Sequence, residues 1–484
     1  MIEKIIIYFI NIKYSRKQQD AVVLAENNKK VSFIGLLKMM LKYVLAFILK
    51  IISIIGYVVN LIKRIIRAII HRFGKTRLGR KIKSCKYIYI SLVNKMADTH
   101  VLGFRNIKVG SLNNVPIECI NDKTIVLDKT TDYVYVPTEM GRSPKKESVD
   151  IPELYVASLC DAEIVGLSNI VVVKDSLIND LSDYSDNDRI DLRYGDLVAT
   201  YKENAIIARR KITRTIDKGI YLVQAGNYNY YHFMIETLSR LVLADEIEKY
   251  RTYPILVDAV VRDNKNFYYI LEKCNIFNHE VIWIDKDEHY IIKELIYSSS
   301  AVLMPGNLKS RDFIKTTDFR VSRWLLQKLR ERMAFSYVEH LNCAKKIMIS
   351  RMNTVNSRLA NENAIKDKLK ECGYTIIFPE QLNVEKQAQI YSDADEIVAT
   401  SGASFANILF CKPNTKILCI IPSEHRFYLY STMAAMLNLD FYAMDAKILE
   451  KAAYAGMDLF SGDLSDIDRW IEVTGAPEQL REKI

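Results

Sequence analysis

Short apolar runs alternate with amphipathic stretches through the second half of this chain, and this alternation limits the possible folds more than any other feature. Each run has the length of one strand, and each following stretch has apolar residues at helical spacing. Strands that alternate with helices form parallel sheets joined by right-handed crossovers. The sequence therefore predicts an α/β fold with strands at residues 220–223, 254–257, 281–284, 346–350, 374–378, 396–400 and 415–421.

A break in this alternation at residues 334–345 separates two such units. Two facing Rossmann-like units would form a cleft at the carboxyl ends of their strands, where ligands bind. Before residue 214 the chain has shorter β-rich runs separated by polar turns. The length of 484 residues exceeds what one core usually organises, so we expect three parts at residues 1–80, 81–335 and 336–484. The predicted helices lie at residues 230–243, 317–333, 360–372, 384–392 and 405–409.

Residues 31–73 combine a strongly apolar composition with regularly spaced lysines and arginines. On a helix these basic residues fall mostly within one third of the circumference, which is typical of a helix lying in the membrane interface against anionic headgroups. One alternative is a helix that spans the membrane over residues 43–62, although Lys50 would then lie near the bilayer centre at a cost of at least ~2.5 kcal/mol. Another is a helix that binds a soluble partner. In either membrane arrangement, the basic cluster at residues 63–81 keeps the globular part on the cytoplasmic side.

The net charge of +10 is concentrated in this basic segment, and the rest of the chain is nearly balanced. No basic–aromatic pattern occurs outside the segment, so we expect no nucleic acid as a partner. The eight cysteines form no CxxC pair and lie near no histidine at a zinc spacing. This pattern favours free thiols in a reducing cytosol.

His232 and Glu236 are four residues apart at the start of a predicted helix, directly after a glycine-containing turn. Both side chains therefore project from one helix face, and both are suitable general bases for an acceptor hydroxyl. The alternative is structural: His232 packs or caps while Glu236 pairs with Arg240, four residues further on. The H-x-x-x-E pattern lacks the second histidine of a zinc motif, so we predict no metal site here.

Arg351 follows the predicted strand at residues 346–350 and is followed by Arg358, Asn361 and Glu362. An arginine at the mouth of the cleft suits a diphosphate, because its guanidinium can donate to two oxygens at once. Asn361 and Glu362 open the next predicted helix. The alternative interpretation is structural: Asn361 caps the N-terminus of the helix, and the helix dipole favours the acidic Glu362 in its first turn.

Ser401, Gly402 and Ala403 form a turn of small residues between a predicted strand and a predicted helix, and Asn407 lies within that helix. Such a turn lets the backbone approach a phosphate, which the first N–H groups of the helix can bind. The alternative is that the glycine only permits close packing between strand and helix.

Together, the segments YYHFMIETLSRL, ISRMNTVNSRLANENAI and ATSGASFANILFCKPNTKI resemble glycosyltransferase family 61, which includes bacterial capsular polysaccharide biosynthesis proteins. The similarity extends over residues 155–421. It implies a GT-B fold, with an acceptor domain at residues 81–335 and a donor-binding domain at 336–484. It also implies inverting transfer from a nucleotide sugar, without a cofactor or an essential metal.

The resemblance also implies roles for individual residues. Arg351, Arg358 and Glu362 would contact the diphosphate or nucleoside of the donor, and His232 and Glu236 would face the acceptor. Asn361, Ser401, Gly402, Ala403 and Asn407 would line the donor pocket. Many members have histidine where this chain has Ser401. A catalytically inactive scaffold in a polysaccharide assembly complex is therefore the alternative function.

These features predict a glycosyltransferase that works at the cytoplasmic face of a bacterial inner membrane, as a peripheral or single-span protein. Its partners would be a nucleotide sugar, a glycan or lipid-linked glycan acceptor, and an anionic membrane surface bound through residues 31–73.

Overall fold

The computed structural model describes residues 104–139, 145–183, 197–201, 204–208, 211–304, 315–334, 343–352, 357–425, 428–452 and 458–475. The chain divides into two compact units, Met1–Ile88 and Tyr89–Ile484, and every described element belongs to the second. The predicted membrane-binding segment at residues 1–80 lies outside the described residues. Among the helices that are described, none is long and apolar enough to cross a membrane.

The larger sheet is mixed, and its parallel part carries the strands predicted after residue 219. β11 (Ile212–Leu222) lies between β12 (Ile255–Asp258) and β14 (His289–Ser298), parallel to both, and β12 pairs in parallel with β13 (Val281–Ile284). The parallel pairing expected for the predicted strands is confirmed, but the sheet continues beyond them: β14, which was not predicted, pairs antiparallel with β6 (Leu154–Val165) of the β-rich part. β6 belongs to the part of the chain without helical crossovers, and antiparallel strands do not need them.

The β-rich part continues the sheet beyond β6 in the order β7-β8-β1-β10-β9, and β2 pairs with β6 on a side branch. The bounds of these strands are β1 Phe104–Gly110, β2 Ile120–Leu127, β7 Val171–Val173, β8 Ser176–Ile178, β9 Leu197–Tyr201 and β10 Asn204–Ala208. Short 3₁₀ helices connect parts of both sheets: η1 Leu112–Asn114, η2 Ile117–Cys119, η3 Asp180–Asp183, η5 Glu248–Tyr250, η7 Thr316–Asp318, η8 Pro379–Gln381 and η10 Ser423–His425.

The second sheet has the order β18-β17-β19-β20-β21-β22, and all its pairs on this path are parallel except the last. Alternate side chains of each central strand belong to different apolar clusters on the two faces of the sheet. In β19, for example, Ile397 and Ala399 belong to one cluster and Val398 belongs to the other. A sheet buried on both faces is typical of doubly wound α/β folds. The strands are β17 Lys346–Ile349, β18 Thr375–Ile377, β19 Glu396–Thr400, β20 Lys416–Ile421, β21 Asp440–Glu450 and β22 Leu459–Gly462.

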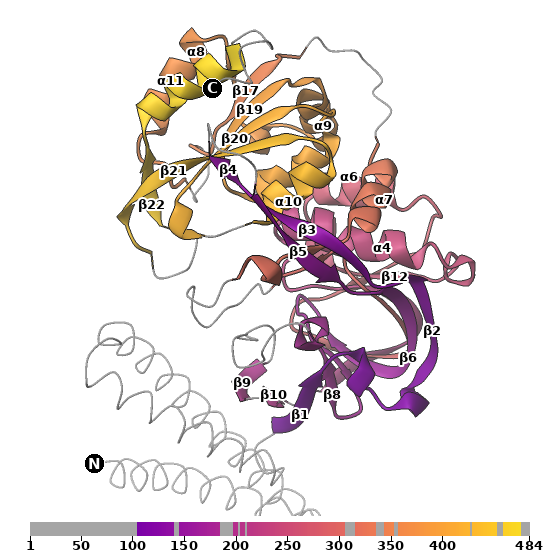
Figure 1. The fold of residues 1–484 in the computed structure, drawn as a ribbon. Helices are drawn as coiled ribbons and strands as arrows, with labels where there is room; N and C mark the ends of the chain where they lie inside the picture. Colours follow the sequence, from indigo (N-terminus) through magenta and orange to yellow (C-terminus); the bar gives the residue numbers. More distant parts are fainter. Residues whose placement is uncertain are drawn as a thin grey trace, which may run out of the picture. The chain divides into compact units, whose positions relative to one another are not determined.

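Helices cover both faces of the second sheet. α8 (Glu362–Glu371) and α11 (Leu464–Gly475) lie on one face, and α9 (Val384–Asp393) and α10 (Leu429–Met436) lie on the other (Figure 1). The predicted helix at residues 405–409 is a 3₁₀ helix, η9 (Ala403–Phe410).

The helices that follow β11 and β16 differ in detail from the sequence prediction. The predicted helix at residues 230–243 begins as a π-helical turn, η4 (His232–Thr237), and continues as α4 (Leu238–Ala244). The predicted helix at 317–333 begins only at Arg323, as α7 (Arg323–Arg332). Its start is fixed by Ser322, whose Oγ accepts a hydrogen bond from the backbone N–H of Leu325. The remaining elements are α5 Ala259–Arg262, α6 Lys265–Cys274, β15 Val302–Leu303 and β16 Arg320–Val321.

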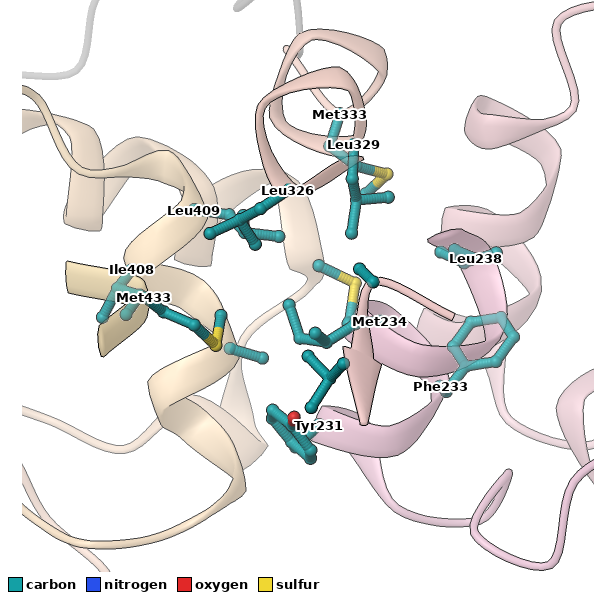
Figure 2. Close-up of a cluster of buried hydrophobic side chains, with 14 of the residues drawn as sticks. Tyr231, Phe233, Met234, Leu238, Leu326, Leu329, Met333, Ile408, Leu409 and Met433 are labelled. Carbon is teal, nitrogen blue, oxygen red and sulfur yellow. The ribbon is translucent and has the colours of Figure 1, made fainter. Parts of the chain in front are cut away.

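One apolar cluster joins the helices of the two sheets. Figure 2 shows Met234 of η4 and Leu326 of α7 facing Leu409 of η9 and Met433 of α10. All four side chains are buried, and each contributes roughly 1.5–3 kcal/mol relative to an exposed position. This packing holds the carboxyl ends of the two groups of parallel strands in a fixed relation.

A hairpin from the β-rich part also reaches the second sheet (Figure 1). It consists of β3 (Thr130–Val136) and β5 (Lys145–Ile151), and the short strand β4 (Thr138–Glu139) between them pairs in parallel with β21. Tyr135 exchanges backbone hydrogen bonds with the hydroxyls of Ser431 and Thr432 on α10. Residues before 335 therefore contribute to the second sheet, which chain order does not predict. The boundary at 335/336 stays a prediction.

Candidate functional site

His232 and Glu236 lie just beyond the carboxyl end of β11 and form a hydrogen-bonded pair. The His232 Nδ1 atom is 2.9 Å from Glu236 Oε2. The turn that precedes them must contain glycine, because a Cβ on Gly226 would come within 2.7 Å of His232 Cβ and Cγ. The predicted proximity of the two side chains is confirmed, and their catalytic role stays a prediction.

The structural alternative for Glu236 is wrong, because Arg240 turns away from it. The Arg240 Nη1 atom donates to the carbonyl oxygen of Ser298 at 2.7 Å, and the guanidinium lies 5.3 Å from the centre of the Tyr297 ring. Glu236 instead accepts hydrogen bonds from His232 and from Gln224 Nε2 through the same Oε2 atom.

Two opposing effects set the pKa of His232. Burial lowers it, but the charge of Glu236 and the hydrogen bond to it outweigh burial, so that the pKa lies above its ordinary value of 6.5. No described residue forms a hydrogen bond with Nε2, and both residues line a cavity of about 220 Å³. The ring can therefore take a proton from a group in this cavity while Glu236 stabilises the imidazolium.

A buried hydrogen-bond network holds Gln224, the residue that donates to Glu236 Oε2, in position. The Thr237 Oγ1 atom lies within hydrogen-bond distance of both Gln224 Oε1 and Asn227 Oδ1. Asp258, at the end of β12, accepts from the Gln224 N–H at 2.9 Å and from Asn227 Nδ2 at 2.6 Å. Burial raises the pKa of Asp258 to about 7 despite these donors. Sequence reasoning missed this network, although Asp258 directly follows a predicted strand, where site residues of α/β sheets are found.

Arg351 and Arg358 from one motif meet Gly402 from another at the carboxyl ends of β17 and β19. The Arg351 Nη1 and Arg358 Nη2 atoms both donate to the carbonyl oxygen of Ser401, at 3.0 and 2.7 Å. The backbone at Gly402 is extended, so its φ angle does not require glycine. The available space does require glycine, because a Cβ at this position would lie 2.3 Å from Arg351 Nη1.

The two guanidinium groups are positioned for an anion. Burial lowers the pKa of Arg351, and burial together with the neighbouring charge of Arg351 lowers that of Arg358 to about 10. The Arg358 Nε atom is buried and finds no hydrogen-bond partner among the described residues. Two cations that share one carbonyl acceptor gain from a ligand with several anionic oxygens.

Residues 230–418 match the family model described as Glycosyltransferase 61. These residues form a glycosyltransferase 61 domain. The matched range contains every site residue predicted above, from His232 to Asn407. No curated protein matches the chain.

Within the glycosyltransferase 61 domain, Glu362 shapes the loop that carries Arg351. Glu362 is buried at the first position of α8, and its Oε1 atom accepts from Ser350 Oγ at 2.5 Å and from the Arg351 N–H at 3.0 Å. Its Oε2 atom is buried without a hydrogen-bond partner in the described part of the chain. The Oε1 atom therefore has a structural role, and a contact between Glu362 and the donor stays a prediction.

Asn361 precedes α8 at the N-cap position, but its side chain makes no capping bond. Both ends of its amide bond to Gly462 instead: Nδ2 donates to the carbonyl oxygen at 2.8 Å and Oδ1 accepts from the N–H at 3.1 Å. The capping alternative for its side chain is wrong. Asn361 ties α8 to β22, and its place in the donor pocket stays a prediction.

Asn407 is fully buried in η9 and links the two halves of the glycosyltransferase 61 domain. Its Oδ1 atom accepts from Tyr230 Oη at 2.6 Å, and its Nδ2 atom donates to Gln387 Oε1 at 2.9 Å. A contact between Asn407 and the donor stays a prediction, while its observed bonds position Ala403 and the rest of η9.

Tyr430 of α10 packs against aromatic side chains that precede and follow the predicted site residues. Its ring centre is 5.7 Å from that of Tyr231, the neighbour of His232, and it stacks on Phe405 at 5.0 Å. Burial raises the pKa of Tyr430, and the charges of Arg351, Glu236 and Arg358 also act on it. Tyr430 thus packs directly against the residue that precedes His232. The apolar sequence around Tyr430 gives no signal of this.

Metal binding is the remaining question for this site. Across the ranges that the structure describes, no group of three or more His, Cys, Asp or Glu is arranged to hold a metal ion. The expectation of transfer without an essential metal stays a prediction.

Proposed function

We propose that this chain is a glycosyltransferase that moves a sugar from a nucleotide-sugar donor to a hydroxyl of a glycan acceptor. The observation that carries the proposal is the convergence of Arg351 and Arg358 on the Gly402 turn, inside a glycosyltransferase 61 domain. Two guanidinium groups beside the start of η9 offer several N–H donors to one diphosphate.

The donor would bind through its diphosphate and its nucleoside. Arg351 and Arg358 would bind the diphosphate oxygens, with the backbone N–H groups at Ala403 and beyond completing the cradle. A ribose hydroxyl would reach the buried Glu362 Oε2 atom, which has no hydrogen-bond partner among the described residues, once the adjoining side chains move aside. These fixed donors would stabilise the negative charge that develops on the departing diphosphate. Electrostatic stabilisation of this kind is usually the largest single contribution to catalysis.

The acceptor would lie in the cavity at His232. Its hydroxyl oxygen attacks the anomeric carbon and forms the new glycosidic bond. The bond from that carbon to the diphosphate breaks, and its electron pair leaves on the diphosphate. The hydroxyl proton passes to His232 Nε2, while Glu236 orients the ring and stabilises its positive charge. Attack from the side opposite the leaving group inverts the anomeric configuration.

We extend the proposal to a GT-B arrangement, with the donor on the second sheet and the acceptor on the first. The carboxyl ends of the parallel strands in both sheets, where His232 and Arg351 lie, support it. A role in capsular or other surface polysaccharide synthesis at the cytoplasmic face of a bacterial inner membrane rests on the family resemblance. The basic amphipathic sequence at residues 31–73 supports a lipid-linked acceptor at an anionic surface.

A thermal-shift screen of the purified full chain against a panel of nucleotide sugars tests the donor site. A ligand at about 100 times its Kd stabilises the folded state by ~2.7 kcal/mol, which raises the melting temperature. We expect one nucleotide sugar to raise it in the wild type and in Arg262→Ala, a variant of an arginine that is half exposed. Arg351→Ala should lose the shift.

Turnover of the same nucleotide sugar separates the enzyme from the scaffold. Slow release of the nucleoside diphosphate in the absence of an acceptor, reduced by about tenfold or more in Arg351→Ala, supports transfer. Binding without any turnover would instead support the scaffold, and an unchanged shift in Arg351→Ala would reject the proposed donor site.

A further inference from the structure

A second cavity lies beside the cavity at His232. Its volume is about 230 Å³, close to the 220 Å³ of the first, and Asp180, Ser300 and Leu303 line both. Each alone is smaller than the ~300 Å³ at which ligand sites in proteins usually begin. Together they fall within the usual range, so the pair has room for a ligand larger than either cavity could hold alone.

Asp180 lines both cavities, and two tyrosines hold its carboxylate. Tyr155, which lines the second cavity, donates to Oδ1 at 2.7 Å, and Tyr297, which lines the first, donates to Oδ2 at 2.9 Å. Tyr297 also stacks on Tyr221, with ring centres 5.9 Å apart. A carboxylate can accept about four hydrogen bonds, so each oxygen can still accept one from a ligand hydroxyl.

The side chains of the second cavity are held in place by neighbours. Lys123 Nζ lies 2.6 Å from Glu153 Oε1 and 4.9 Å from the centre of the Tyr155 ring. Asn113 Nδ2 donates to Asp183 Oδ2 at 3.2 Å. Planar amides and carboxylates in fixed positions suit the fixed hydroxyls of a sugar ring, because little side-chain entropy is then lost on binding.

The charges in the second cavity disfavour an anionic ligand. Lys123 and Lys129 line it, and so do the carboxylates of Glu153, Asp180 and Asp183. Lysine charge is therefore matched or exceeded by carboxylate charge, and a phosphate or uronate would gain no net attraction. A neutral ligand with many hydroxyls can use both kinds of group.

The first cavity has an aromatic side chain at its edge. Tyr228 lines this cavity and is 66% exposed, although most large apolar side chains nearby are buried. An exposed aromatic face offers apolar area at little entropic cost. The C–H face of a sugar ring can stack on it.

We propose that the two cavities are adjoining acceptor subsites for a neutral glycan of at least two sugar residues. The terminal sugar lies in the first cavity with its reactive hydroxyl at His232, and the preceding sugar lies in the second, beyond Asp180. This assignment rests on the proposed function, because it takes His232 as the base that meets the acceptor.

A glycan array carrying chains of one to four sugars tests the two subsites without needing the donor. The full chain should bind glycans of two or more sugars and give little signal on single sugars. In Asn113→Ala/Lys129→Ala this signal should fall about tenfold, because the glycan would lose one or two hydrogen bonds. Lys370→Ala, at an exposed position on α8, is the matched control and should bind as the wild type does.

The Arg351→Ala variant distinguishes failure of this inference from failure of the proposed function. It should keep the glycan signal and lose the thermal shift with nucleotide sugars. Equal binding of single sugars, unchanged binding in the double variant, or no binding to any glycan would overturn the two subsites. A wild-type chain that selects two-sugar glycans but responds to no nucleotide sugar would contradict the transferase proposal alone.

Discussion

The Nη1 atom of Arg351 occupies the space that a side chain on Gly402 would need, with 2.3 Å between Nη1 and an ideal Cβ position. These two residues are far apart in sequence and come from adjacent parallel strands of the second sheet. The same guanidinium donates to the carbonyl oxygen of Ser401. The glycine therefore permits the close approach of a charged side chain, and the first prediction concerns this contact.

Gly402→Ala should push Arg351 away from the turn and weaken nucleotide-sugar binding. Loss of one charge-assisted hydrogen bond is worth about 1.5–3 kcal/mol, so we expect Kd to rise by about tenfold or more. Isothermal titration with the nucleotide sugar found in the screen measures this. Ser404→Ala, in the first turn of η9, should bind normally, and normal affinity in Gly402→Ala would contradict the assigned contact.

The pH dependence of transfer should report His232. The base must be neutral to accept a proton, and Glu236 raises the pKa of His232 above 6.5, so kcat/KM should rise with pH through an inflection above 6.5. Glu236→Gln removes the negative charge that raises the pKa of His232, so the inflection should move to lower pH. Glu272→Gln, an exposed variant on α6, should leave the profile unchanged.

His232→Gln should reduce kcat by about 10²–10⁴, the usual contribution of a general base. Its nucleotide-sugar thermal shift should stay that of the wild type, because His232 belongs to the acceptor side. A profile without an inflection above 6.5 in the wild type, or a fully active His232→Gln, would assign the base elsewhere.

Residue order and residue type predicted the parts of the site that lie at strand ends. His232, Arg351 and Gly402 each follow a short apolar strand, and parallel strands bring their carboxyl ends to one edge. The meeting of Arg351 with the Gly402 turn follows from that geometry. The mixed α/β class was predicted for the same reason.

Features that depend on side-chain direction or on pairing between distant segments were not predicted. Tyr430 packs against Tyr231, yet its neighbours in sequence are those of an ordinary core helix. The pairing of β4 with β21 joins Thr138 to Tyr442, and no local pattern encodes it. The sequence predicted that Asn407 lies on a helix. It did not predict the hydrogen bond between the Asn407 amide and Tyr230, because that bond depends on how distant segments pack.

The hydrogen bond from Tyr230 to Asn407 should contribute measurably to stability. Tyr230→Phe keeps the ring but leaves the buried Asn407 Oδ1 without this donor, a loss of about 1–3 kcal/mol in the free energy of unfolding. Urea denaturation followed by tryptophan fluorescence measures it. Tyr228→Phe, two residues away and exposed, is the control and should have little effect. Equal stability of the two variants would mean that the bond across the domain contributes nothing.

His279 should make the stability of the chain depend on pH. Its Nε2 atom lies 2.8 Å from Asp245 Oδ1 and its Nδ1 atom 2.7 Å from the Tyr253 carbonyl oxygen, and Arg332 Nη1 donates to the other oxygen of Asp245 at 2.7 Å. Both ring nitrogens face acceptors, so both carry protons and the ring is an imidazolium. Burial lowers the pKa of His279, but these two hydrogen bonds outweigh it and raise the pKa above 6.5.

A raised pKa in the folded state means that this contribution is complete below the unfolded value of 6.5 and is lost as pH rises through the folded value. The difference in unfolding free energy between wild type and His279→Gln should therefore be largest near about pH 5.5 and shrink toward about pH 9. Urea titrations at several pH values measure both proteins. A difference that stays constant with pH, or grows as pH rises, would show that His279 is neutral in the folded chain and that Asp245 is balanced by Arg332 alone.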